Sequence, residues 1–491
     1  MSPPKPVRAR TSRSCGNCRA VKRRCDQQLP HCGQCVRMRE TCPGYRDEWD
    51  LVFRDQTNQT IKRTNEKRAR SAATAGANDV PAPARELSPN PDQIGINYFL
   101  SNFVLGGPSS SRGYLNYIPS VYVNDGEHPT LVASLAAVGL VALANSTQQP
   151  ELVTHARAKY MEAIHNVNNA LASPSESIKD STLMSVISLG MFEQVSGFET
   201  WVQHVEGAAA LVVARGKSQF SSPVTIRMFN QVRADLVIAS LHGTKPISRD
   251  MLELQEEAAK HTDTASAFWQ IGILGTRCAN LLFALRESTG GRRSAEFLKE
   301  ATSIERDLQR NVESLAIEEP YTTTQEPSGD PSIILNGRVD RYQDIWAIRV
   351  WNNSRNLHMI LCEMICYLLN RILGQNPASS LHSSMNYRLQ ETLQTLSRLG
   401  NDFLATIPQA LEISSSPSDP RPSLDLSFRG NISGGYMLTW GLYMVGKCAV
   451  TTKETRKWII QRLQSIGSNA GTSVALQLVE DIIKIDQLTA S

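Results

Sequence analysis

Residues 15–42 read CGNCRAVKRRCDQQLPHCGQCVRMRETC and hold six of the ten cysteines in this 491-residue chain. The cysteines form an internal repeat, in which the second trio copies the first after a shift of 17 residues: Cys15, Cys18, Cys25 and then Cys32, Cys35, Cys42. A cluster of this kind forms a disulfide knot, a redox site or a metal site. The choice among the three decides how this part of the chain folds.

The start of the chain disfavours disulfides. Residues 1–14, MSPPKPVRARTSRS, are polar and proline-rich and lack the apolar stretch of a secretory signal. We therefore expect a reducing compartment, in which thiols persist and disulfides are rare. A thioredoxin-like redox site at CGNC would need a βαβ pattern around it, which is absent from the surrounding sequence. The pattern therefore favours a metal site.

Two zinc ions can share six cysteines. A structural zinc ion takes four ligands in a tetrahedron, so two separate sites would need eight cysteines. Six are enough if four sulfurs bind one ion each and two sulfurs bridge both ions. The repeat indicates that the bridging pair comes from equivalent places in the two halves.

The charge of the chain is divided unevenly. Residues 1–70 contain 17 Lys and Arg against 7 Asp and Glu, and the remaining residues contain 34 against 40. The net charge of +4 therefore combines a basic end of +10 with an acidic remainder of −6. A basic end that carries the cysteine cluster indicates a nucleic-acid-binding module attached to a larger body.

The cysteine stretch resembles the fungal zinc binuclear cluster domain, the DNA-binding module of a large family of fungal transcription factors. The likeness covers the six cysteines, the pattern CxxCRxxKxxCD from Cys15 to Asp26, and Pro30 in the middle loop. It implies two zinc ions bridged by Cys15 and Cys32. One ion would be bound by Cys15, Cys18, Cys25 and Cys32, and the other by Cys15, Cys32, Cys35 and Cys42.

The basic run between Cys18 and Cys25 is the predicted DNA-contacting segment. We expect a short helix over these residues, because a helix fits the major groove, where Lys or Arg donates to the O6 and N7 atoms of guanine. The resemblance implies that Lys22 reads a base of a CGG-like triplet, although Val21 stands where some relatives carry a second basic residue. Phosphate contacts are assigned to Arg19, Arg23 and Arg24 and, by symmetry in the second half, to Arg37 and Arg39.

A linker that is partly helical and then disordered is predicted at residues 43–93. Its opening, PGYRDEWDLVFRD, resembles a linker segment common in filamentous-fungal members of the family, but no sustained heptad pattern follows. Binding to DNA as a homodimer is therefore left open. Residues 71–93 are predicted to be disordered, because they are rich in Ala, Pro and Asn. The flexible basic arm at residues 1–14 and the basic cluster at residues 62–70 fit import into the nucleus.

Residues 94–491 are predicted to form one all-α domain. Apolar residues recur at helical spacing in many segments, and residues 341–373 form one long apolar helix or a helix pair. Strand-like alternation is hard to find, so we expect an antiparallel helical array, with a solenoid-like arrangement left open. Residues 318–332 and 414–423 are predicted to be exposed loops.

The longest apolar run, from Leu131 to Ala144, predicts a buried core helix. It is shorter than the roughly 20 residues that a membrane span needs. We therefore expect no membrane partner.

The body resembles the fungus-specific transcription factor domain of the second class. The likeness rests on the helix with Tyr160, the pattern W-x2-H-x2-GA-x2-L-x3-RG from Trp201 to Gly216, and WNxxR from Trp351 to Arg355. It implies a regulatory domain. His204, inside the second pattern, is predicted to be satisfied by a neighbouring helix rather than to bind a ligand.

Catalytic signatures are absent from the sequence, which has no P-loop, GxSxG or HExxH motif. His358, Cys362 and Cys366 share a helix face, but the ends of this set are about 12 Å apart along the helix axis. A single zinc ion could not bind all three. We expect buried thiols and no enzymatic activity.

Together these features predict a nuclear, sequence-specific regulator of RNA polymerase II transcription that binds double-stranded DNA. The resemblance extends this to control of a metabolic or secondary-metabolite gene cluster. Residues 474–488 are either a last packing helix or a segment that docks a coactivator or corepressor. The alternative function is a helical scaffold or ligand sensor whose zinc module binds DNA without sequence preference.

Overall fold

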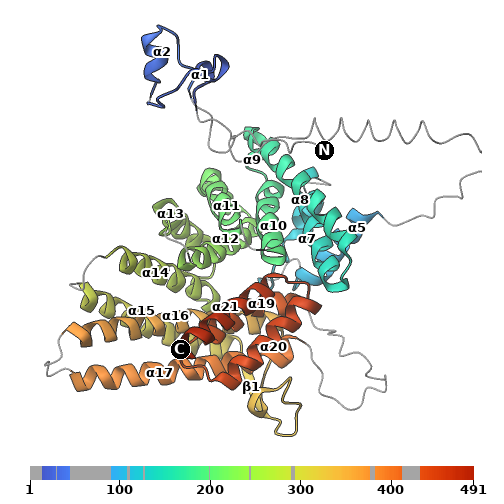
Figure 1. The fold of residues 1–491 in the computed structure, drawn as a ribbon. Coiled ribbons are helices and arrows are strands. Elements are labelled where there is room, and N and C mark those ends of the chain that lie inside the picture. The colour runs from blue at the N-terminus through green and yellow to red at the C-terminus, as the bar shows by residue number, and fades with distance from the viewer. Residues whose placement is uncertain are drawn as a thin grey trace, which may run out of the picture. The chain divides into compact units, whose positions relative to one another are not determined.

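The computed structural model describes residues 14–28, 30–44, 90–107, 111–124, 128–197, 200–242, 245–288, 293–375, 382–411 and 432–490. The chain divides into two compact units, Met1–Leu87 and Ser88–Ser491 (Figure 1). The predictions for the basic arm, for most of the linker, for the basic cluster at residues 62–70 and for the loop at residues 414–423 fall outside the described residues.

The described part of the first unit contains two short helices, α1 (Gly16–Ala20) and α2 (Gly33–Arg37). The helix predicted from Cys18 to Cys25 is therefore wrong in its bounds, because α1 both begins and ends earlier. Cys15 caps the start of α1, since its Sγ accepts a hydrogen bond from the amide of Cys18. The helix stops because the backbone enters the left-handed region at Lys22, where φ is 53°.

The first half of the second unit is a group of helices around one hydrophobic core. Its α-helices are α5 (Pro91–Phe103), α6 (Ile118–Asn124), α7 (Pro129–Thr147), α8 (Pro150–Leu171), α9 (Pro174–Ser177), α10 (Asp180–Ser196), α11 (Trp201–Arg215), α12 (Pro223–His242) and α13 (Arg249–Ala258). Two 3-10 helices join them, η1 (Lys217–Ser221) and η2 (Ala259–His261).

Helix α7 is at the centre of this core. Most of its side chains are buried, because α5, α8 and α10 all pack against it. It contains the apolar run from Leu131 to Ala144, so the predicted core helix is confirmed. Gly139 permits the close approach of α5, since a Cβ atom there would lie 1.8 Å from the carbonyl oxygen of Gly95.

The second half of the body is formed by longer helices and two further cores. The α-helices are α14 (Ala267–Glu287), α15 (Ser294–Glu318), α16 (Ile345–Gln375), α17 (His382–Leu404), α18 (Ile407–Ala410), α19 (Ile432–Lys447), α20 (Lys453–Asn469) and α21 (Val474–Ala490). Helices α14 to α17 run side by side, each packed on the next (Figure 1). The long apolar segment predicted as one helix or two is the single helix α16.

The end of the body packs against its beginning. Helix α19 contacts α5, α20 contacts α7, and α21 contacts α10. In an open solenoid each unit would contact only its neighbours along the chain. The described helices therefore form an array that closes on itself, and the all-α prediction is confirmed without the solenoid-like arrangement.

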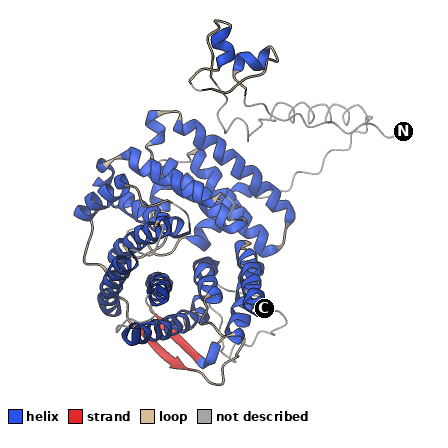
Figure 2. Ribbon diagram, turned by 60° about the vertical axis from the view of Figure 1, so that its left-hand side comes forward, coloured by secondary structure: helices blue, strands red, loops and turns tan. Residues whose placement is uncertain are grey.

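One hairpin interrupts the helices (Figure 2). Strand β1 (Tyr321–Gln325) pairs antiparallel with β2 (Arg338–Tyr342), with Tyr321 opposite Tyr342 and Thr323 opposite Asp340. A 3-10 turn, η4 (Leu335–Gly337), precedes β2. The loop predicted at residues 318–332 is thus partly wrong, since its threonines form a strand, as β-branched residues favour. Five residues were too few for an alternating pattern to stand out.

By length and composition alone, three described helices could cross a membrane: Pro129–Thr147, Ala267–Glu287 and Ile345–Gly374. In the most apolar window of each, 72%, 50% and 56% of the residues are buried inside the protein. Packing within the body accounts for their apolar character, because a helix covered on several sides is hydrophobic on several sides.

Candidate metal centre and nucleic-acid interface

The six cysteine sulfurs come together around the starts of α1 and α2. They form two overlapping sets, and within each set all sulfurs lie within 4.8 Å of one another: Cys15, Cys18, Cys25, Cys32 and Cys15, Cys32, Cys35, Cys42. Cys15 and Cys32 belong to both sets. These two residues open the two halves of the repeat, so the shared pair occupies equivalent places.

The spacing of the sulfurs fits tetrahedral zinc. The Sγ of Cys15 lies 3.5 Å from that of Cys32, and the Sγ of Cys18 lies 3.7 Å from that of Cys32. Four sulfurs bound at about 2.3 Å around one zinc ion would be about 3.8 Å apart. The six cysteines form no disulfides. Zinc bound here would hold α1 and α2 together through shared sulfurs.

Burial and hydrogen bonding act on the thiols in opposite directions. The backbone amide of Cys35 donates to the Sγ of Cys32 at 3.3 Å and lowers the pKa of that thiol to about 6. Burial raises the pKa of the Cys18 thiol to about 12. A metal-bound thiol is deprotonated, so zinc binding must overcome the cost of burying these sulfurs as thiolates. Zinc bound by these sulfurs would keep them ionised.

Helix α1 ends in a Schellman motif that has Lys22 at its left-handed position. The amide of Lys22 donates to the carbonyl of Arg19 at 3.3 Å, and the amide of Arg23 donates to that of Cys18 at 2.8 Å. Glycine usually occupies this position. A residue with a Cβ atom pays roughly 1–2 kcal/mol for the left-handed conformation. An exposed lysine thus stands where the backbone alone would favour glycine.

The second half repeats this turn bond for bond. The amide of Arg39 donates to the carbonyl of Val36 at 3.1 Å, and the amide of Glu40 donates to that of Cys35 at 2.9 Å. Arg39 takes the left-handed conformation, with φ of 56°. The internal symmetry of the sequence therefore extends to the backbone, and Arg39 is the structural counterpart of Lys22.

The other predicted DNA contacts differ in how far they are free. Arg24 is exposed, whereas Arg19 is half-buried and donates through Nη1 to the carbonyl of Ser14 at 3.2 Å. Arg23 forms an ion pair with Glu40. Glu40 is the repeat counterpart of Arg23, so this pair joins equivalent points of the two halves. In this arrangement Arg23 links the halves and is not presented as a free cation.

The sequence indicated Asp26 only as the last residue of the CxxCRxxKxxCD pattern, and its structural role was not predicted. Its Oδ1 accepts a hydrogen bond at 2.9 Å from the amide of Gly33, the first residue of α2. A Cβ atom at Gly33 would lie 2.5 Å from Asp26 Oδ2, so a larger residue there would displace the Asp26 carboxylate. The internal repeat could have pointed to this position, because Gly33 matches Gly16 after the shift of 17 residues.

Two family models match the chain. The fungal Zn(2)-Cys(6) binuclear cluster domain matches residues 13–50, and the fungal specific transcription factor domain matches residues 96–482, which is most of the chain. The chain belongs to the fungal-specific transcription factor family. A search of the curated proteins and a search of the solved structures found no match.

The transcription factor thus binds DNA through a module that takes two zinc ions. Its family is one of transcription regulators and not of enzymes, which confirms the predicted class of function. The family also implies a role in the nucleus.

The motifs that carry the likeness in the body of the transcription factor lie in its core. The hydroxyl of Tyr160 on α8 and Nε2 of His204 on α11 are 2.9 Å apart, so His204 is satisfied by a neighbouring helix. Arg355 on α16 is buried and donates to the hydroxyl of Tyr342 on β2 at 2.7 Å. The Nε1 of Trp351 donates to the carbonyl of Glu319 at 2.7 Å. These residues tie helices together.

A second cluster of metal-ligand types lies inside the body. Glu305, His358 and Cys362 have ligand atoms within 4.8 Å of one another, and Cys366 is not part of this group. Glu305 is already paired with the guanidinium of Arg388, and burial raises the pKa of the Cys362 thiol. An arginine cation on the carboxylate opposes a metal ion there, so we interpret the cluster as part of the polar core.

Proposed function

We propose that this transcription factor reads a CGG-like element through Lys22. The observation that carries the proposal is the place of this lysine: it is exposed, and it follows directly on a helix whose other end is capped by Cys15 of the sulfur cluster. Its conformation is one that glycine would adopt at lower cost. A cation kept at such a position indicates a role outside the module itself.

The zinc ligands follow the two sulfur sets. One ion is bound by Cys15, Cys18, Cys25 and Cys32, and the other by Cys15, Cys32, Cys35 and Cys42. The support for this assignment is that Cys15 and Cys32 belong to both sets of neighbouring sulfurs. In the zinc-bound module, α1 is held rigidly enough to present Lys22 to a base edge in the major groove.

Arg19 and Arg24 contact phosphates, which position the module without reading sequence. Arg23 is assigned a weaker part in DNA binding, because Glu40 pairs with it. Arg37 and Arg39 extend the phosphate contacts to the second half. The difference between the halves lies in charge: Arg23 of the first half corresponds to Glu40 of the second, so the first half is the more basic.

Further predictions concern the compartment and the partners of the transcription factor. Residence in the nucleus agrees with the family. Helix α21 packs on α19, α20 and α10, which favours the packing helix over a free segment that docks a coactivator or corepressor. Homodimer formation and control of a metabolic or secondary-metabolite gene cluster stay predictions.

Selection of bound sites from a pool of random duplexes, with the full zinc-loaded chain, tests the proposed function. We expect enrichment of a CGG-like triplet. Salt-sensitive binding without an enriched motif would reject the proposal and favour a helical scaffold whose module binds DNA non-specifically.

A further inference from the structure

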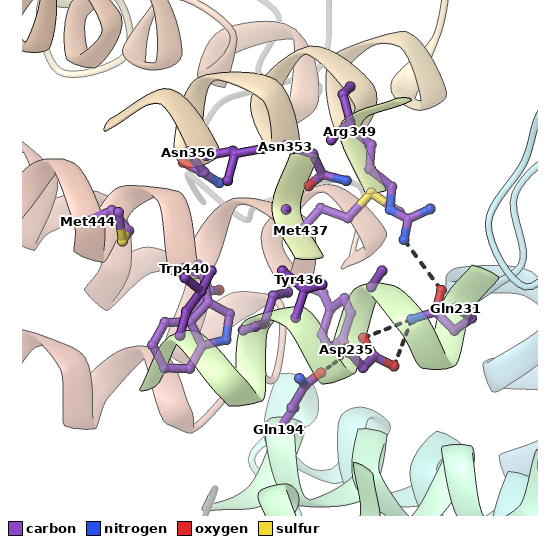
Figure 3. A pocket seen from close by; sticks show the side chains of 18 of the residues that line it. Gln194, Gln231, Asp235, Arg349, Asn353, Asn356, Tyr436, Met437, Trp440 and Met444 are labelled. Atoms are coloured by element: carbon purple, nitrogen blue, oxygen red, sulfur yellow. Dashed lines mark hydrogen bonds between the residues drawn. The ribbon is translucent and has the colours of Figure 1, made fainter. Parts of the chain in front are cut away.

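The helical body contains a partly open cavity where its two halves meet. The lining comes from α10 and α12 of the first half and from α14, α16 and α19 of the second (Figure 3). The cavity volume is about 200 Å³. A water molecule needs roughly 10–15 Å³ on the same measure, so this space has room for an organic molecule.

One face of α19 sets the length of the cavity. Tyr436, Met437, Trp440 and Met444 all line it, and they span two turns of the helix. Two turns correspond to about 12 Å at a rise of 1.5 Å per residue. The cavity therefore suits an elongated molecule rather than a compact one.

The charged side chains of the cavity gather at one end (Figure 3). Trp440 and Met444 lie toward the other end, together with the amide of Asn356. At the charged end, Gln231 links two charged groups, since its Nε2 donates to both oxygens of Asp235, at 3.0 and 2.9 Å, and its Oε1 accepts from Arg349 at 3.3 Å. A ligand that fits both ends has an apolar body and a polar head.

The two charges at the polar end are not equally satisfied. The guanidinium of Arg349 lies over the ring of Tyr114, 4.4 Å from its centroid, and also donates to Gln231. Asp235 accepts only from the neutral amide of Gln231, and no described lysine, arginine or histidine forms an ion pair with it. Arg349 lines the same cavity, but it is held by Gln231 and Tyr114 and forms no direct ion pair with Asp235. The buried carboxylate can therefore accept hydrogen bonds from a positively charged ligand.

The ionisation of Asp235 agrees with this reasoning. Burial raises the pKa of its carboxyl to about 6, against the opposing effects of the Gln231 hydrogen bond and the Arg349 charge. At pH 7.5 the group is therefore still mostly ionised. The enclosed site strengthens its attraction for a cation compared with the same pair in water.

We infer that this cavity binds a small elongated organic amine, with its ammonium group on Asp235 and its apolar body between Trp440 and Met444. The ammonium donates to the carboxylate oxygens, and Tyr436, which donates to Gln194, forms part of the wall beside it. Because the lining comes from both halves of the body, a bound amine stabilises them together. The inference concerns the regulatory domain and does not depend on which DNA element Lys22 reads.

Three matched probes test the inference: 4-phenylbutylamine, 4-phenylbutanol and 5-phenylpentanoate. They share a phenyl group on a flexible chain and differ in the charge of the head. Calorimetric titration into the full zinc-loaded chain at pH 7.5 should give an affinity for the amine at least about tenfold above that for the alcohol, since a hydrogen bond to a charged group is the stronger one. The acid should bind most weakly.

Substitution of the carboxylate locates the effect. Asp235→Asn keeps the shape of the side chain and should abolish the preference for the amine. The control is Asp481→Asn on α21, a half-exposed aspartate that is not part of the lining and should leave the preference unchanged.

Several outcomes would overturn the inference. They are equal binding of amine and alcohol, a preference for the acid, an unchanged preference in Asp235→Asn, and no binding of any probe at 10 mM, a generous ceiling for fragments of this size. The comparison of the three probes uses the unaltered chain and does not depend on how the variant folds.

Discussion

The zinc module and the helical body reach a stable fold by different means. In the module, the buried cluster consists of cysteines, and two helices of five residues each are attached to it. In the body, large clusters of apolar side chains hold together helices of up to 31 residues. Few residues decide the first fold, and many decide the second.

This difference indicates which kind of change would unfold each unit. Among its described residues, the only buried cluster of the module is that of the cysteines, and helices this short are not stable alone. The body spreads its stability over many contacts, so a single substitution removes only a part of it. Changes to one unit should therefore leave the other folded.

Removal of zinc should have the largest effect. A strong chelator is expected to unfold residues 15–42 and abolish DNA binding completely, because metal-binding free energy supplies the folding free energy of such modules. Far-UV circular dichroism should change little, since the body carries nearly all of the helix. Specific DNA binding that survives chelation would contradict the zinc-dependent fold.

A substitution that creates a new cavity in the core of the body should have the second largest effect. Phe403→Ala on α17 removes a fully buried ring and should lower the free energy of unfolding by about 3–5 kcal/mol. Tyr387→Ala on the same helix is the control, since Tyr387 is 73% exposed and should cost about 0.5 kcal/mol or less. Denaturant titration measures both. DNA affinity should stay unchanged, and its loss in Phe403→Ala would show that the units are not independent.

Because Lys22 has a left-handed backbone conformation, its replacement by glycine separates base recognition from the folding of the module. Lys22→Gly should leave the module as stable as before or slightly more so, because glycine suits this backbone. It should still cost about 1–3 kcal/mol of discrimination at one base pair. Competition binding with single-base variants of the selected site measures this loss.

Arg39→Gly is the matched control, since it makes the same change in the same turn of the other half. It should weaken binding to all sequences alike. If Lys22→Gly did the same, Lys22 would be a phosphate contact and not a base reader.

The smallest effect is expected for Glu40→Gln. This change releases Arg23 from its ion pair and removes a negative charge from the DNA-binding unit. One added phosphate contact should steepen the dependence of log affinity on log salt by about 0.9. An unchanged salt slope would mean that Arg23 stays on the second half without Glu40.

The sequence predicted the site better than it predicted local structure. The cysteine spacing led to the two zinc ions, and the sulfur sets in the structure agree with the number of bonds available. The bounds of α1 were wrong, because the pattern of basic residues extends beyond the point where Lys22 turns the backbone. Cysteine spacing reports which side chains can meet, but a backbone dihedral angle leaves little trace in composition.

For the body, periodicity predicted the helices but not their neighbours. The apolar run from Leu131 to Ala144 identified a core helix by itself. The packing of α19 and α21 against the first helices could not be predicted, because such contacts join residues hundreds of positions apart.

By itself, the sequence determined the metal, the charge division and the helical class of the body, because each depends on residue type and short-range spacing. Only the tertiary structure decided that Arg23 is held by Glu40, that Lys22 and Arg39 take the same backbone turn, and that Asp235 and Arg349 line one cavity. The turn depends on backbone angles that residue type does not reveal, and the other two features arise from packing between residues that are distant in the chain.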